Sequence, residues 1–201
     1  LNIKPMLECL SKLPSSIPVF GCSANAYEMN APTYVFSNDG ILQKGIIAIC
    51  FLGKSLHIHI TKNIGWKPLG RSMIITSTYG NNIVCELDNK PAISVYEKYL
   101  NISKNKRFYT ETVEFPIFIE RNGRNMARLP FAYTDDGALI FTADCQKGER
   151  VRLAYGDPNE ILRNSKANQR ETLDFVPEGI LLLSCASRRI FLQDNIKVEL
   201  E

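Results

Sequence analysis

Chemically capable side chains gather at the end of one apolar run, in the stretch LLLSCASRR. Cys185 follows three leucines and a serine, and Arg188 and Arg189 come three and four positions later. A thiol near cations can act as a nucleophile, because positive charge favours the thiolate. A guanidinium turned toward the interior can instead bind a carboxylate or another anion. The stretch therefore has two interpretations, a catalytic cysteine or an anion-binding arginine.

A serine or cysteine nucleophile also needs a base, and this sequence offers few. Ser23 lies in GCSAN, which faintly resembles the G-x-S-x-G nucleophile elbow but has Asn25 in place of the last glycine. The only two histidines are His57 and His59. We therefore favour a non-catalytic protein, in which the Ser23 hydroxyl caps backbone amides in a tight loop.

The two histidines stand two positions apart in LHIHI, so in a strand both imidazoles point to one face. Such a pair can form half of a metal or haem site. The favoured interpretation is a solvated face, with Leu56, Ile58 and Ile60 facing the core. Neither an H-E-x-x-H motif nor a cluster of acidic ligands accompanies the pair. We expect no metal and no cofactor, and haem binding stays an alternative.

Two further side chains are candidates for a ligand site. Trp66, the only tryptophan, lies in the glycine-bearing stretch GWKPLG between two predicted strands. It covers the edge of the core or lines the mouth of a pocket. Arg128 lies in the apolar stretch ARLPFAY and needs a carboxylate partner or an anionic ligand. We favour a structural salt bridge for Arg128.

The elements that must position these residues are mainly hairpins. Helical spacing of apolar residues predicts a helix over 2–13, which Pro14 ends. Strand signals follow, with turns at NDG and GNN. The apolar run GIIAICFL suits a strand covered on both faces. The stretch NKPAISVYEKYL predicts a helix with Pro91 at its first position, and we place a domain boundary there, between residues 1–88 and 89–201.

The second half repeats the hairpin style, with turns at RNGR and TDDG. Asp157 as N-cap, Pro158 at the first helical position and Glu160 two positions on predict a helix start. GILLLS then predicts a buried strand that ends at Cys185. The predicted fold class is α+β, with two mainly antiparallel β-sheet subdomains built from hairpins and a few packed helices.

Composition excludes several classes of protein. The net charge of +3 comes from scattered basic residues, which argues against nucleic acid as a partner. No apolar run reaches the length of a membrane span, and no signal peptide is evident. Six cysteines without a C-x-x-C pair indicate a reducing, cytoplasmic compartment. Because the chain begins at Leu1, we expect a fragment of a longer protein.

The chain resembles FIST domains, which are intracellular sensory domains of bacterial signal transduction and also occur attached to F-box proteins. The resemblance lies in the order and spacing of the stretches IPVFGCSAN, TYVFSNDG, GWKPLGR, NKPAISVYEKYL, DGALIFTADCQKGERVRLAYGDPNEIL and GILLLSCASRR. Cys185 and Arg188 match a C-x-x-R element after the last apolar strand of the family. The usual first segment and a later GFYTYGE-type motif are absent, so residues 1–88 resemble the end of the N-terminal part and residues 89–201 a truncated C-terminal part.

The resemblance implies a cytoplasmic sensory module without catalysis of its own. It implies binding of a small polar ligand, with amino acids proposed, and control of an output domain such as a diguanylate cyclase or a histidine kinase, in the same polypeptide or as a partner kinase. Two alternatives stay open, a haem-binding nitric oxide sensor and a protein-interaction scaffold. The candidate ligand-binding residues are Ser23, Trp66, Arg128, Cys185 and Arg188.

Overall fold

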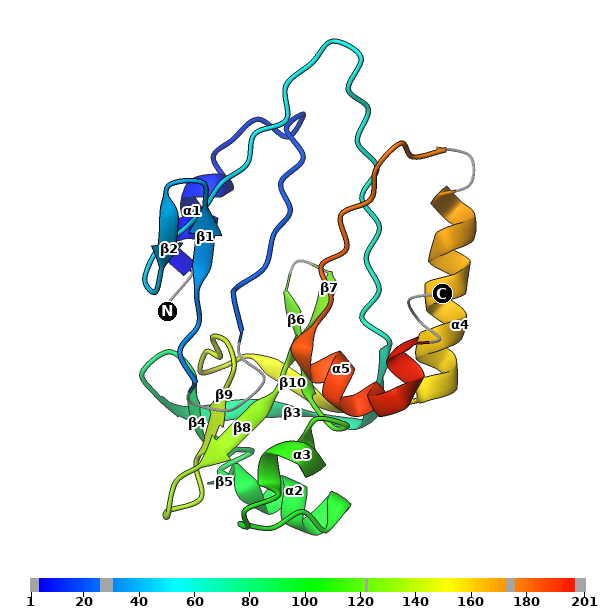
Figure 1. Ribbon diagram of the computed structural model, residues 1–201. Coiled ribbons are helices and arrows are strands. Elements are labelled where there is room, and N and C mark those ends of the chain that lie inside the picture. The colour runs from blue at the N-terminus through cyan, green and yellow to red at the C-terminus, as the bar shows by residue number, and fades with distance from the viewer. Residues whose placement is uncertain (1–3, 26–30, 122, 173–175, 198–201) are drawn as a thin grey trace. The chain divides into compact units, whose positions relative to one another are not determined.

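The computed structural model describes residues 4–25, 31–121, 123–172 and 176–197 (Figure 1). The chain forms two compact units. Unit 1 consists of Leu1–Thr61 with Asp174–Ala186, and unit 2 consists of Lys62–Leu173 with Ser187–Glu201. The α+β class is confirmed, because antiparallel sheets and helices occur together. The boundary predicted between residues 88 and 89 stays a prediction.

Unit 2 is built on an eight-stranded sheet whose strand order is β7-β6-β10-β3-β4-β9-β8, with β5 paired to β4. All of its pairs are antiparallel. The strands are β3 (Trp66–Tyr79), β4 (Ile83–Leu87), β5 (Lys90–Pro91), β6 (Ile117–Arg121), β7 (Arg124–Arg128), β8 (Pro130–Tyr133), β9 (Leu139–Phe141) and β10 (Arg150–Gly156). The hairpins β3–β4, β6–β7 and β8–β9 confirm the predicted turns, since each joins neighbours in the sheet.

One prediction about this sheet was wrong. GWKPLG is not a loop between two strands, because Trp66 already begins β3 and pairs with Gly156 at the end of β10. Leu69 pairs with Leu153 in the same ladder. Pro68 pairs with Ala154 within this ladder, and the register shifts between Val151 and Leu153.

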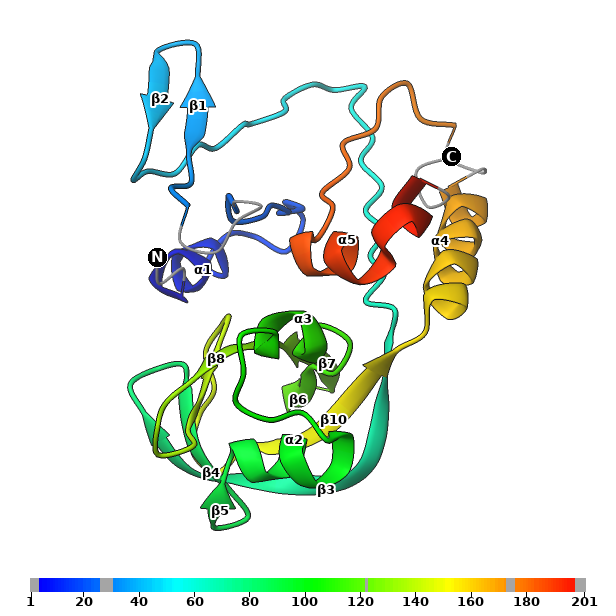
Figure 2. The same cartoon turned by 60° about the horizontal axis from the view of Figure 1, so that its bottom comes forward.

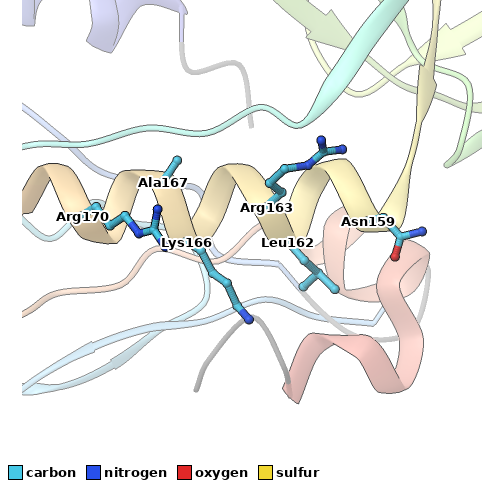
Figure 3. A pocket seen from close by; sticks show the side chains of 6 residues that line it. All are labelled: Asn159, Leu162, Arg163, Lys166, Ala167 and Arg170. Atoms are coloured by element: carbon cyan, nitrogen blue, oxygen red, sulfur yellow. The ribbon is translucent and has the colours of Figure 1, made fainter.

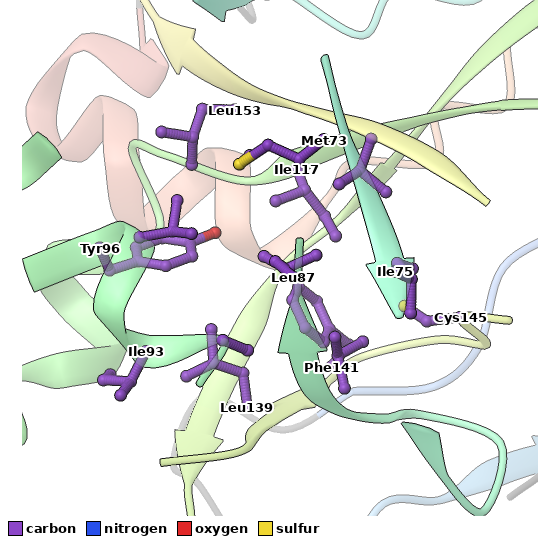
Figure 4. Close-up of a cluster of buried hydrophobic side chains, with 14 of the residues drawn as sticks. Met73, Ile75, Leu87, Ile93, Tyr96, Ile117, Leu139, Phe141, Cys145 and Leu153 are labelled. Atoms are coloured by element: carbon purple, nitrogen blue, oxygen red, sulfur yellow. The ribbon is translucent and has the colours of Figure 1, made fainter. Parts of the chain in front are cut away.

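The core of unit 2 lies inside the curve of the sheet, where α2 (Ile93–Leu100) and α3 (Phe108–Thr112) pack (Figure 2). Figure 4 shows the side chains of this core, contributed by both the sheet and α2. Tyr96 is fully buried and donates its hydroxyl to the Phe115 carbonyl at 2.9 Å. The prediction for Pro91 was wrong, since Pro91 lies in β5 and the helix begins at Ile93.

Two helices follow the sheet in unit 2. α4 (Pro158–Thr172) begins as the sequence predicts, because the Asp157 carboxylate accepts the Asn159 amide at 2.9 Å and the Glu160 amide at 3.4 Å. α5 (Ala186–Leu192) continues into a short 3-10 turn, η1 (Gln193–Asn195). LLLSCASRR is therefore not a strand end with a polar tail, because its last four residues start a helix.

Unit 1 holds α1 (Lys4–Leu10) and a hairpin of β1 (Val35–Ser37) and β2 (Gly40–Leu42). The hairpin confirms the predicted turn at Asn38–Gly40. α1 is shorter than the predicted helix over 2–13, whose first two residues lie outside the described part of the chain.

The predicted strands at 17–21, 45–52, 55–61 and 179–184 belong to no ladder among the described residues. Their apolar side chains are exposed, to 92% for Leu52 and 83% for Ile180. The expectations that GIIAICFL is covered on both faces and that Leu56, Ile58 and Ile60 face a core are thus wrong for this structure. Apolar sequence favours an extended chain, but burial requires partner strands that the described part of the chain does not supply.

Candidate functional site

One polar site in unit 2 surrounds Arg188 on α5. Arg188 is only 6% exposed. Its guanidinium donates to the Asn63 carbonyl at 3.0 Å and to the Ser165 hydroxyl at 2.8 Å. These bonds join the segment before β3, the middle of α4 and α5. The Arg188 side chain, which was predicted to face a ligand or a structural partner, is therefore buried in unit 2.

The Ser165 hydroxyl is the centre of this network. It donates to the Ile161 carbonyl at 3.0 Å and accepts the Asn63 amide at 3.3 Å as well as the Arg188 guanidinium. The same Asn63 amide lies 3.4 Å from the Ile161 carbonyl. Neither Asn63 nor Ser165 was predicted from the sequence. The only signal was the spacing of Ile161 and Ser165, four apart on one helical face.

Trp66 lies next to this network, at the start of β3. Its indole N–H donates to the Glu114 carbonyl at 3.1 Å, and its ring packs against Phe191 with centroids 5.6 Å apart. Phe191 is one turn beyond Arg188 on α5, so two of the predicted ligand residues meet around one helix. We call the set of Asn63, Trp66, Ser165, Arg188 and Phe191 the Trp66–Arg188 corner.

Two glycines let the elements of this corner approach closely. Gly65 has φ +80°, and a Cβ there would lie 2.6 Å from the Ile161 side chain. A Cβ at Gly156 would lie 2.7 Å from the Phe191 ring and 2.9 Å from the Trp66 indole nitrogen. The Trp66–Arg188 corner is therefore tightly packed.

Arg128 occupies a different environment. Its guanidinium donates to the Asp144 carboxylate at 3.0 Å and to the Asp144 carbonyl at 2.8 Å. Arg121 pairs with the same carboxylate at 2.7 Å and with Glu149 at 2.5 Å. Burial acts to raise the pKa of Asp144, but the hydrogen bonds and charges of the two arginines outweigh it and lower that pKa. Arg128 thus forms a structural salt bridge, as its position in an apolar stretch predicted.

The other two candidates, Ser23 and Cys185, lie in unit 1 and are exposed. His57 and His59 are exposed in the same unit. Across the described residues, no group of three or more His, Cys, Asp or Glu side chains is arranged to hold a metal ion. The structure therefore brings together Trp66 and Arg188 alone among the predicted ligand residues of unit 2.

A second feature lies on the outer side of α4, where a hollow of about 380 Å³ follows the helix (Figure 3). It is lined by Asn159, Leu162, Arg163, Lys166, Ala167 and Arg170. None of these residues was among the candidate ligand residues predicted from the sequence.

Comparison with known families defines the class. Residues 1–90 match the FIST N domain and residues 92–201 match the FIST C domain. The chain therefore belongs to the FIST family, whose domains are sensory and act in signal transduction. Searches of curated proteins and of solved structures found no match. No helix in the described ranges is long and apolar enough to cross a membrane.

Proposed function

We propose that this chain is a non-catalytic, cytoplasmic sensory module that binds a small polar ligand, with an amino acid as the favoured class. The ligand regulates an attached output domain, such as a diguanylate cyclase or a histidine kinase. The observation that supports this proposal is the buried Arg188 guanidinium, which donates to the neutral oxygens of Asn63 and Ser165 beside the Trp66 ring.

A ligand carboxylate would compete well for that guanidinium. A carboxylate can accept two parallel hydrogen bonds from one arginine, and such charge-assisted bonds are short and strong. The Trp66 ring offers an apolar surface to the rest of a small ligand. Arg128 is left out of this proposed site, because its guanidinium is bound to Asp144. Ser23 and Cys185 stay predictions.

Signalling would follow from the packing of the corner. Because Gly65 and Gly156 hold the surrounding side chains in contact, a ligand that binds Arg188 favours an arrangement with α5 displaced. The ligand thus shifts the chain between two states, and the output domain responds to the difference.

The test uses the full chain and a panel of the twenty common amino acids, with Trp66 fluorescence and thermal unfolding as measurements. A ligand at a hundredfold excess over its Kd stabilises by about 2.7 kcal/mol. That corresponds to a rise in Tm of about 5–10 °C for a chain of this size. Arg188→Lys keeps the charge but removes the paired donors, so it should weaken binding at least tenfold.

Arg189→Gln, at the exposed neighbouring position, is the matched control and should leave binding unchanged. Stabilisation by an amino acid that is equal in the parent chain, Arg188→Lys and Arg189→Gln would place the ligand elsewhere. If none of the amino acids changes either the fluorescence or the Tm, the proposal fails for this ligand class.

A further inference from the structure

The two faces of α4 have opposite character. Ile161 and Ser165 lie on the face that contacts Gly65 and Arg188. At about 100° per residue, Arg163, Lys166 and Arg170 fall within an arc of about 60° on the other side of the helix. All three cations are exposed. They form a basic stripe, defined as Arg163, Lys166 and Arg170, that extends about 10 Å along the helix axis.

The stripe borders the hollow on α4 shown in Figure 3. Ala167 has a short side chain between the longer cationic ones, which leaves space for a group from outside. Leu162, half-buried at the edge of the hollow, supplies an apolar wall. The surface therefore combines positive charge with an apolar recess, which suits an occupant that carries both carboxylates and an apolar side chain.

Internal ion pairs neutralise only one end of the stripe. Arg163 pairs with Glu160, and Glu160 also pairs with Lys67 at 2.7 Å. In the described part of the chain, no ion pair joins Lys166 or Arg170 to a carboxylate. Two cations of the stripe are thus available to an external anion.

We propose that the outer face of α4 docks an acidic amphipathic helix of a partner protein. Cations at positions i, i+3 and i+7 match carboxylates with the same spacing on a facing helix, and an apolar side chain of that helix would enter the hollow beside Ala167. The docking face is separate from the Trp66–Arg188 corner, so this proposal does not depend on the proposed ligand.

Two other occupants fit less well. A second copy of this chain offers no matching helix among those described. The helices α1, α2 and α3 each carry one carboxylate and α5 carries none. The two carboxylates of α4, Glu160 and Glu171, are too far apart in the sequence to match the spacing of the stripe. Nucleic acid binding draws on many phosphate contacts, and three cations on a chain of net charge +3 provide few.

The test measures binding of the full chain to a fluorescent synthetic helix by anisotropy. The probe carries Glu at positions i, i+3 and i+7 around one leucine, and the control probe has Gln at the same positions. We expect the Glu probe to bind, and we expect its affinity to fall as the salt concentration rises. Two exposed ion pairs of about 0.7 kcal/mol each correspond to about tenfold in affinity, so Lys166→Gln with Arg170→Gln should weaken binding about tenfold.

Lys147→Gln with Arg150→Gln is the matched control, because it removes two exposed cations outside α4 and should leave binding unchanged. Lys166→Glu with Arg170→Glu should bind a probe that carries Lys in place of Glu, which separates a lost contact from a lost fold. The proposal is overturned if the Gln probe binds equally, if the control pair weakens binding as much, or if a 20-nucleotide single strand or anionic phosphatidylserine vesicles bind more tightly than the Glu probe.

Discussion

The Arg188 guanidinium donates to the Ser165 hydroxyl at 2.8 Å, although 23 positions separate the two residues in the sequence. This bond fastens α5 to the inner face of α4. A ligand that draws Arg188 away would release that face, while the outer face of the same helix carries the basic stripe. The proposed ligand site and the proposed docking surface are therefore linked through one helix.

Replacing Ser165 with alanine should destabilise unit 2. The substitution removes an acceptor of a buried guanidinium, and an unmet hydrogen bond to a charged group costs about 1.5–3 kcal/mol. Urea unfolding followed by Trp66 fluorescence measures the change, because Trp66 lies in the same corner. Ser103→Ala removes an exposed hydroxyl and serves as the control. Equal stability of the two variants would show that the Arg188–Ser165 bond contributes nothing measurable.

Gly65→Ala should cost more stability than Gly70→Ala. Both glycines lie in β3 or next to it and have positive φ, +80° and +70°, so alanine is strained at either position. Only at Gly65 does the added Cβ meet another side chain, Ile161 at 2.6 Å, whereas nothing lies within 4 Å at Gly70. We expect an extra loss of about 1–3 kcal/mol for Gly65→Ala, measured by urea unfolding. A smaller loss at Gly65 than at Gly70 would contradict the close packing.

Asp144→Asn should weaken the chain at neutral pH and reduce its sensitivity to acid. The pKa of Asp144 lies below its ordinary value, so its contribution to stability is complete above the unfolded pKa of about 4 and is lost as pH falls through the lower folded value. The substitution should cost about 2 kcal/mol at pH 7. Between pH 7 and pH 3, the free energy of unfolding should then fall less for Asp144→Asn than for the parent chain.

Asp135→Asn removes a carboxylate of the exposed turn before β9 and is the control for that experiment. Its pH profile should follow the parent. If the stability of Asp144→Asn falls with pH as much as that of the parent, the prediction is wrong and other carboxylates cause the acid sensitivity.

Local signals in the sequence predicted the hairpins well, because turns such as GNN and TDDG act over a few residues. The cap at Asp157 was predictable for the same reason. The contacts of Arg188 were not, since they join three segments that only the folded chain brings together. Ser165 lies in a polar stretch of the sequence, and no pattern in one sequence shows that a hydroxyl will face a guanidinium 23 positions away.

The main errors concern strand burial. GIIAICFL and GILLLS have the apolar composition of buried strands, yet side chains such as Leu52 and Ile180 are exposed in the described structure. Apolar composition indicates how much a segment would be stabilised if it were buried. Whether it is buried depends on neighbouring strands that come from other parts of the sequence. The helix at Ala186 was missed because the leucines before it favoured a continuing strand, while the helix-forming residues Ala186 to Arg189 were too few to show a period.

Alkylation should divide the cysteines by environment. Burial raises the pKa of Cys145 to about 12, so almost no thiolate forms there at pH 8. Cys9, Cys22, Cys50 and Cys185 are exposed and should react with iodoacetamide in a short pulse, as peptide mass spectrometry after quenching would show. Cys145 should become modified only after urea unfolds unit 2, because the thiolate is the reacting species. Rapid labelling of Cys145 in the native chain would mean that the core opens locally.

The same experiment tests the catalytic interpretation of LLLSCASRR. An activated nucleophile reacts faster than an ordinary exposed thiol. Labelling of Cys185 much faster than of Cys9, Cys22 and Cys50 would therefore support a catalytic cysteine.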